Sequence, residues 1–315
     1  MSDILFLFQQ TMFFFIPLLI VALGGLFSER SGIINIALEG MMIIGAFAGI
    51  FFIHFFQEAM DPQICLLVAL LIAGLSGTLF ALFHAIASIN MKADQTISGT
   101  ALNMFAPAFC IFVARLVQQT QQVEFSNTFR ITKVPVLGDI PFIGEFLFQN
   151  TYITNFLGIL ILILSWLILD KTRFGLRLRS CGELPQAADS AGINVYKIRY
   201  AGTLISGFLA GIGGLIFIVP TSTNFNADVA GYGFLALAVL IFGQWKPWHI
   251  AGAAFFFGFM KTIASAGLPF LASLAIPNYF YKITPYVATL IVLAFTSKNS
   301  AAPRAEGEPF DKGKR

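Results

Sequence analysis

Residues 33–54 read IINIALEGMMIIGAFAGIFFIH, a stretch with one acidic residue, Glu39, and neither lysine nor arginine. A helix of about 20 mostly apolar residues crosses the hydrocarbon core of a bilayer, so this stretch predicts a membrane span. Of the 315 residues, 57% are apolar and 11% charged, against roughly 25% charged in soluble domains. These values exclude a soluble enzyme, a secreted disulfide scaffold and a nucleic-acid binder. The net charge of +3 is too small to indicate a polyanionic partner.

Similar apolar stretches recur along the whole chain and predict an all-α polytopic membrane protein. We count about nine transmembrane helices, with roughly eight to ten as the acceptable range. Two stretches are short enough to be broken or tilted helices, as transporters often contain. The stretches are residues 10–27, 33–54, 63–89, 97–117, 151–170, 200–220, 231–245, 249–267 and 282–297, of which 231–245 and 282–297 are the short ones.

The placement of lysine and arginine predicts the orientation, because cytoplasmic loops of membrane proteins are rich in both. Six of the 19 basic residues lie in segment 171–199 and five lie after residue 297. We therefore expect both segments to be cytoplasmic. An odd number of spans then puts the N-terminus on the external side.

Little of the chain is expected outside the bilayer. Residues 1–297 form one predicted transmembrane domain, with segment 171–199 as its cytoplasmic loop and 118–150 as an irregular external loop with short helices. The tail, residues 298–315, is charged and rich in Pro and Gly, so we expect disorder. No GxxxxGK[ST] motif is present, so any use of ATP falls to another chain.

Small residues four positions apart predict close helix packing. The pairs are Gly45 with Gly49, Gly207 with Gly211, and Ala254 with Gly258. Such pairs support either static packing or helices that slide during transport.

Glu39 is the first candidate for a residue of a substrate path, because an ionisable group at membrane depth normally faces a cavity or a partner. Asn35 is four residues earlier, so it would share a helical face with Glu39 in a helix over 33–54. The alternative is a hydrogen bond between helices that fixes their packing, with Lys261 as one possible partner of Glu39.

A second polar stretch, ADQTISGTALNMF (93–105), places Gln95, Ser98 and Asn103 at the start of a span. Ser98 and Gly99 are candidates for interrupting that helix and exposing backbone groups to a ligand. The alternative is an ordinary helix start, capped by Ser98 or a neighbouring threonine.

Cysteine and histidine indicate no metal site. Cys65, Cys110 and Cys181 are widely separated, and no CxxC or Cys/His cluster supports a disulfide framework or zinc site. We assign the scattered histidines to packing or interfacial positions. HExxH, GxSxG and aspartate-rich motifs are missing from the sequence, so we predict no catalytic residue, metal or cofactor.

The middle loop reads LDKTRFGLRLRSCGELPQAADSAGINVYKIRY (169–200). Pro185 suits the first turn of a short helix and Gly192 its C-terminal cap, and a further helix is expected to start near Asn194. A short helix with small side chains between basic flanks fits a groove on another protein. The alternative is a connector without a partner.

Four segments together resemble the bacterial ABC-importer permeases of the branched-chain amino acid/ribose class, in their nucleoside or simple-sugar subgroup. The resemblance covers about residues 10–297. Family members commonly have Gly where Ala37 stands and Asn where Leu184 stands. The segments are LFSERSGIINIALEGMMIIGAF (26–47), ADQTISGTALNM (93–104), TRFGLRLRSCGELPQAADSAGINVYKIRY (172–200) and GYGFLALAVLIFGQWKP (231–247).

This resemblance implies a non-catalytic permease subunit in the bacterial inner membrane. Such subunits pair with a second permease, typically a different and longer homologue, and receive substrate from a membrane-anchored binding lipoprotein. Separate ATPase subunits dock on the cytoplasmic loop, where the resemblance implies that Glu183, Ala187, Ala188 and Gly192 form the coupling element.

The sequence therefore predicts import of nucleosides driven by ATP hydrolysis on a partner chain. The candidates for the substrate path are Asn35, Glu39, Gln95, Ser98 and Asn103. One alternative is the same kind of permease for ribose, other sugars or branched-chain amino acids. Another is an ATP-independent secondary transporter that uses Glu39 as a proton or ion site.

Overall fold

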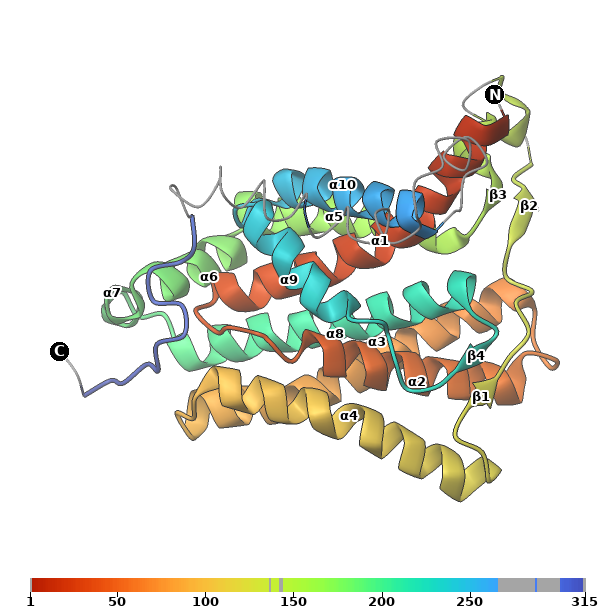
Figure 1. The fold of residues 1–315 in the computed structure, drawn as a ribbon. Helices are drawn as coiled ribbons and strands as arrows, with labels where there is room; N and C mark the ends of the chain where they lie inside the picture. The colour runs from red at the N-terminus through yellow and green to blue at the C-terminus, as the bar shows by residue number, and fades with distance from the viewer. Residues whose placement is uncertain (1, 136, 142–143, 266–286, 288–300, 314–315) are drawn as a thin grey trace.

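The computed structural model describes residues 2–135, 137–141, 144–265, 287 and 301–313. It is a bundle of long helices whose axes run in broadly the same direction (Figure 1). The helices are α1 (Ser2–Arg30), α2 (Leu38–Phe56), α3 (Pro62–Ala85), α4 (Gln95–Gln118), α5 (Ile153–Lys171), α6 (Arg173–Glu183), α7 (Pro185–Ser190), α8 (Val195–Thr221), α9 (Tyr232–Phe242) and α10 (Pro247–Ser265), with a π-helical turn, Ile86–Asn90, that continues α3.

Six helices in the described part of the chain are long and apolar enough to cross a membrane: α1, α2, α3 with its π-helical turn, α4, α5 and α8. The prediction of an all-helical, multi-pass membrane protein is confirmed. Helix α9 is a shorter apolar helix, as its sequence indicated. The predicted span 282–297 lies outside the described residues, residue 287 excepted, so the count of nine stays a prediction.

Helix α8 is the centre of the bundle and packs against α1, α2 and α3. Glycines make these contacts close, as the small-residue pairs predicted. A Cβ added to Gly45 would lie 2.3 Å from the Gly211 Cα, and one added to Gly211 would lie 2.2 Å from the Ala73 carbonyl oxygen. The α8 backbone therefore touches two neighbouring helices at one position, with no room for a side chain.

One end of the bundle, here called the strand end, carries two short antiparallel ladders (Figure 1). Strand β1 (Val123–Glu124) pairs with β4 (Asn224–Phe225), and β2 (Ile131–Lys133) pairs with β3 (Gln149–Thr151). The segment 118–150 was expected to be irregular with short helices. It does contain a 3-10 turn and a π-helical turn, but the two ladders were not predicted, because strands of two or three residues have no detectable sequence period.

The other end, here called the α7 end, carries α6, α7 and the C-terminal tail (Figure 1). The N-terminus lies toward the strand end, so the two termini are at opposite ends of the bundle.

The tail differs from the expected disorder. Residues 301–313 follow a defined path in which Ala305 and Phe310 are buried. The Ala305 amide donates to the Gly182 carbonyl at 2.8 Å and the Gly307 amide to the Gly32 carbonyl at 3.1 Å. Composition suggested disorder because most of the tail is polar, but backbone hydrogen bonds and two apolar side chains attach it to the bundle.

The close crossing at Gly211 predicts a large penalty for adding a single methyl group. Gly211→Ala should lower the free energy of unfolding by about 1–3 kcal/mol, the usual cost of overpacking. Gly252→Ala in α10 is the matched control, because nothing lies within 4 Å of its added Cβ. Thermal unfolding of both variants in detergent tests this, and an unchanged melting temperature for Gly211→Ala would show that the crossing is loose.

Candidate functional site

The chain leaves helical geometry between α1 and α2, and this non-helical stretch, residues 31–37, is here called the break. Its residues are largely buried. In a bilayer, non-helical backbone is tolerated only where protein or water satisfies its hydrogen bonds, since each unpaired group costs several kcal/mol. The partners of the break are therefore the first question about this region.

Side chains from α3 and α4 supply partners for the middle of the break. The Ile34 amide donates to Gln95 Oε1 at 2.7 Å, and the Ile34 carbonyl lies 2.9 Å from His84 Nε2. The other ring nitrogen of His84 lies 3.2 Å from the Ser98 hydroxyl oxygen. Gln95 and His84 thus contact the break directly, and Ser98 contacts it through His84.

Asn103 bridges the break and the first turn of α2. Its Nδ2 donates to the Ile36 carbonyl at 2.8 Å, while its Oδ1 accepts from the Gly40 amide at 2.7 Å. Ile36 and Gly40 are four residues apart, so in a continuous helix these two groups would bond to each other, and the Asn103 carboxamide replaces that one hydrogen bond.

Asn35 lies within the break, which corrects the expectation that it shares a helical face with Glu39. Helix α2 begins only at Leu38. The Asn35 side chain points to α8, where its Nδ2 donates to the Ser206 hydroxyl at 2.8 Å. The pattern of apolar residues over 33–54 did not reveal the break. The residues on either side of Asn35 are apolar, and such residues suit a buried backbone whether it is helical or not.

The start of α4 also differs from one expectation. Helix α4 runs without interruption from Gln95 to Gln118, so Ser98 and Gly99 do not break it. Its N-cap is Asp94, whose Oδ1 accepts from the Thr96 and Ile97 amides at 2.8 and 2.9 Å. Asp94 has the geometry for this role since it stands just before the first helical turn.

Glu39 connects the start of α2 to the start of α9. Its Oε1 accepts from the Gly231 amide at 2.9 Å and its Oε2 from the Gly233 amide at 2.5 Å. A Cβ at Gly233 would lie 2.4 Å from the Glu39 amide nitrogen, so only glycine permits this approach. The carboxylate thus occupies the site where the first amides of α9 need acceptors.

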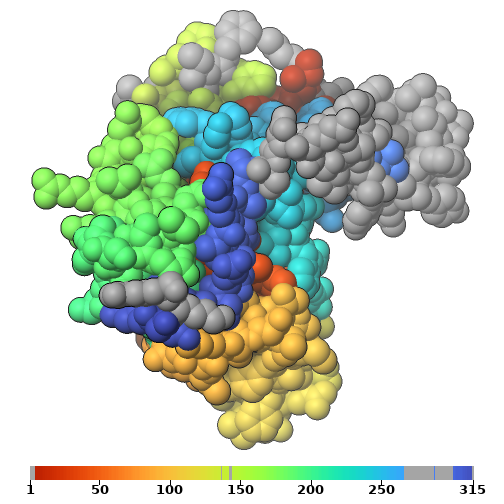
Figure 2. All heavy atoms as spheres, turned by 90° about the vertical axis from the view of Figure 1, so that its left-hand side faces the viewer, coloured from red at the N-terminus to blue at the C-terminus, as the bar shows by residue number. Residues whose placement is uncertain are grey.

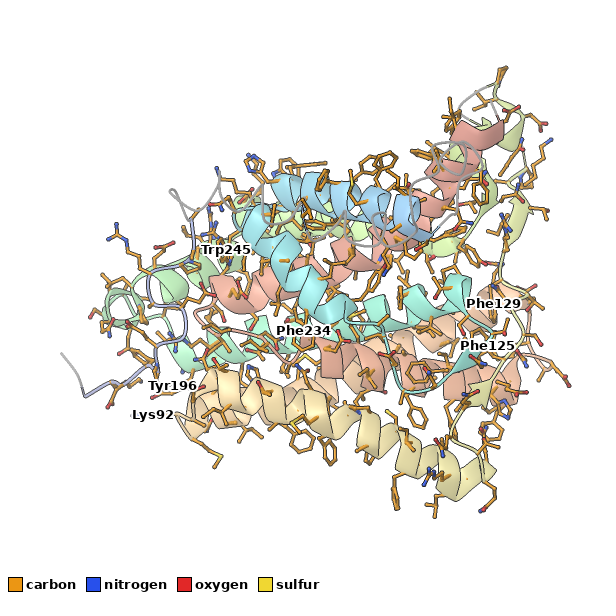
Figure 3. All side chains as sticks on the ribbon, viewed as in Figure 1. Lys92, Phe125, Phe129, Tyr196, Phe234 and Trp245 are labelled. Carbon is orange, nitrogen blue, oxygen red and sulfur yellow. The ribbon has the colours of Figure 1, made fainter. Side chains whose placement is uncertain are left out.

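This junction of α2 and α9 lies deep in the bundle. Helix α9 has 11 residues, which at about 1.5 Å per residue cover roughly half of the hydrocarbon core. Figure 3 places Phe234, in its first turn, near the middle of the bundle's length. Two helix N-termini therefore meet inside the bundle, each after a stretch of non-helical backbone.

Lys261 lies near this junction without forming an ion pair with Glu39 in the described structure. Its Nζ lies 6.0 Å from the centre of the Tyr232 ring, a cation–π arrangement. The Tyr232 ring stacks on Phe217, with ring centres 3.9 Å apart. The partners of Glu39 are backbone amides, so the suggested pairing with Lys261 is not observed.

The middle loop has the predicted helices. Pro185 opens α7, Gly192 has a φ of +82° after it, and the Asn194 side chain caps α8 by accepting from the Lys197 amide at 3.0 Å. Of the four predicted coupling residues, Ala187 is exposed, Ala188 is buried, and Glu183 lies 3.6 Å from Arg30. Gly192 is exposed, and nothing lies within 4 Å of a Cβ added to it.

The structure brings all five predicted path residues to one place, around the break and the first turn of α2. Sequence reasoning missed His84, which was assigned to a packing or interfacial position, and Ser206. A polar residue within a long apolar helix was the available signal for both. The three cysteines are free and buried, burial raises the pKa of the Cys181 thiol, and no metal-binding cluster occurs among the described residues.

Comparison with known proteins gives a family match over most of the chain. Residues 7–293 match the family model described as "Branched-chain amino acid transport system / permease component". The chain is 45% identical over 312 residues to the guanosine ABC transporter permease protein NupQ of Bacillus subtilis, covering 97% of this chain and 96% of NupQ. No solved structure matches.

Two proteins of one Lactococcus lactis strain are also similar. The nucleoside ABC transporter permease protein NupC is 42% identical over 299 residues, covering 95% of this chain and 94% of NupC. The nucleoside ABC transporter permease protein NupB is 23% identical over 312 residues, covering 95% of this chain and 84% of NupB. One bacterium thus has both a similar and a more distant relative of this chain.

Removing the Asn103 carboxamide should destabilise the fold. Asn103→Ala leaves the Gly40 amide and the Ile36 carbonyl unpaired, and each such buried group costs about 1–3 kcal/mol. Thr100→Ala, one turn away, is the control, because the exposed Thr100 hydroxyl bonds only to its own helix. Thermal unfolding in detergent is the measurement, and equal melting temperatures for the two variants would contradict the bridging role of Asn103.

Replacing the Glu39 carboxylate should loosen the start of α9. In Glu39→Gln one of the two oxygen acceptors becomes a donor that faces a backbone amide, so we expect a loss of about 1.5–3 kcal/mol in unfolding free energy. Glu58→Gln, at an exposed acid near the strand end, should change nothing. Hydrogen exchange at Gly231 and Gly233 should rise only in the first variant, and unchanged exchange there would refute the contact.

Proposed function

The chain belongs to the family of branched-chain amino acid transport system permeases, and from that membership we propose that it is the permease subunit of an ATP-driven importer of nucleosides. The observation that carries the proposal is near full-length similarity to permeases named for guanosine and for nucleosides. The membrane-length helices supply the physical means, since a polar nucleoside cannot cross the bilayer core unaided.

We place the substrate path beside the junction of α2 and α9. The wall of that path is held by five residues that bond to backbone groups or to the side chains of His84 and Ser206: Asn35, Glu39, Gln95, Ser98 and Asn103. Broken helices at mid-membrane are where transporters of other folds bind substrate. A neutral, hydroxyl-rich nucleoside needs hydrogen-bond partners there and no opposite charge.

ATP hydrolysis is assigned to a partner chain that docks on α7. Glu183, Ala187, Ala188 and Gly192 form the coupling element in this proposal, with Ala187 presented outward and Ala188 packed inward. The α7 end is then cytoplasmic and the strand end external. The cluster of basic residues in segment 171–199 supports this orientation.

The second permease and the receptor are also part of the proposal. Lactococcus lactis has both NupC and the more distant NupB, which supports a pair of unlike permeases. A substrate-binding lipoprotein would deliver the nucleoside at the strand end.

Uptake of labelled guanosine by cells that carry or lack this gene tests the function. We expect gene-dependent uptake that falls on ATP depletion, survives an uncoupler while ATP is maintained, and is competed by unlabelled nucleosides. Competition by ribose or leucine instead would support the other substrates of this permease class. Uptake that persists without ATP and stops with the uncoupler would support the secondary-transporter alternative and contradict the proposal.

A further inference from the structure

The C-terminal tail, residues 301–313, joins parts of the α7 end that are far apart in sequence. Its backbone bonds to Gly182 at the end of α6 and to Gly32 in the break. Near its start, the Ala301 amide donates to Gln244 Oε1 at 3.0 Å, next to the end of α9. The tail thus contacts the ends of two helices and the break.

Arg199 attaches the middle of the tail to α8. Its side chain is buried, with 1% of the residue exposed, and its Nη1 donates to the Glu308 carbonyl at 2.8 Å. Its Nη2 lies so close to Gly32 that a Cβ there would be 2.7 Å away. The same guanidinium, on the fifth residue of α8, therefore contacts both the tail and the break.

The far end of the tail is attached to α7 and α8. Phe310 is 4% exposed and packs in a cluster with Cys181, Ala188 and Val195, and its ring meets Tyr196 edge-on at 5.4 Å. Lys312 lies 3.7 Å from Asp189 of α7. The tail therefore contacts the proposed coupling helix on two sides, through Phe310 at the buried Ala188 and through Lys312 at Asp189.

The outer side of the tail forms one surface with α7. Figure 2 looks onto the α7 end, where the tail, in blue, crosses the face between the green segment that includes α6 and α7 and the orange segment of α3 and α4. Arg304, Glu308 and Lys312 are exposed, and Lys312 lies 3.7 Å from Asp189, two residues after the exposed Ala187. A protein that docks on α7 meets these charged side chains in the same contact.

We propose that residues 301–313 are part of the ATPase docking surface, and that they tie the coupling helix α7 to the break ahead of α2. This inference rests on the proposed function and extends it to a segment that the family match, residues 7–293, does not include. The partner is an ATPase subunit that contacts α7 and carries groups complementary to Arg304 and Lys312. Force on α7 then reaches Gly32 through both the tail and Arg199.

Affinity of the ATPase for the full-length permease pair in lipid nanodiscs tests the proposal. The ATPase subunit that co-purifies with the wild-type complex is the probe. The test variant is Arg304→Ala combined with Lys312→Ala. The control is Lys133→Ala at the strand end, because Lys133 and Lys312 are both exposed lysines paired with an aspartate. Ala187→Glu on α7 tests the docking site already proposed.

We expect the double variant to weaken ATPase binding about tenfold, a typical loss for interface anchors, with an unchanged melting temperature, and Lys133→Ala to bind as wild type. Phe310→Ala should keep docking partly intact but lower uptake per ATP hydrolysed. Binding of the double variant within about twofold of wild type, while Ala187→Glu loses binding, would overturn this inference alone. If no ATPase co-purifies with the wild-type complex, the proposed function itself fails.

Discussion

The structure depends on one constraint: the backbone of residues 31–37 is non-helical and largely buried, so its polar groups need hydrogen-bond partners. Side chains from three helices supply these hydrogen-bond partners. Ser28 of α1 donates to the Ile33 carbonyl at 2.8 Å, and Gln95, His84 and Asn103 pair with the groups that follow. An unpaired polar group would be far more costly there than at a surface, so these side chains fix where α2 starts.

The start of α2 in turn fixes the start of α9. With Leu38 as the first residue of α2, Glu39 stands at mid-bundle, where its carboxylate accepts from two amides of α9's first turn. The same break contacts the tail at Gly32. A single irregular segment therefore connects the polar junction of α2 and α9 with the face on which an ATPase is proposed to dock.

The sequence predicted the helices well, because apolar runs bounded by charged segments are a strong signal for membrane spans. It also identified Gln95, Ser98 and Asn103 as unusual, since polar side chains within a span need partners. It did not predict what they contact. The hydrogen bonds of Gln95 and Asn103 join residues 61, 63 and 67 positions apart, so they leave no local pattern in the sequence. Neither the break nor the burial of Phe310 alters the amino-acid composition, on which the interpretation of each segment rested.

Hydrogen exchange of the protein in nanodiscs tests the central claim most directly. The Ile34 and Gly40 amides, which bond to Gln95 and Asn103 instead of to helical carbonyls, should exchange slowly, as amides in the neighbouring helices do. Gln95→Ala should release Ile34 and leave Gly40 protected, because the two amides have separate partners. Rapid exchange of both amides in the wild-type protein would contradict the account, because the break would then be open to water instead of being held by side chains.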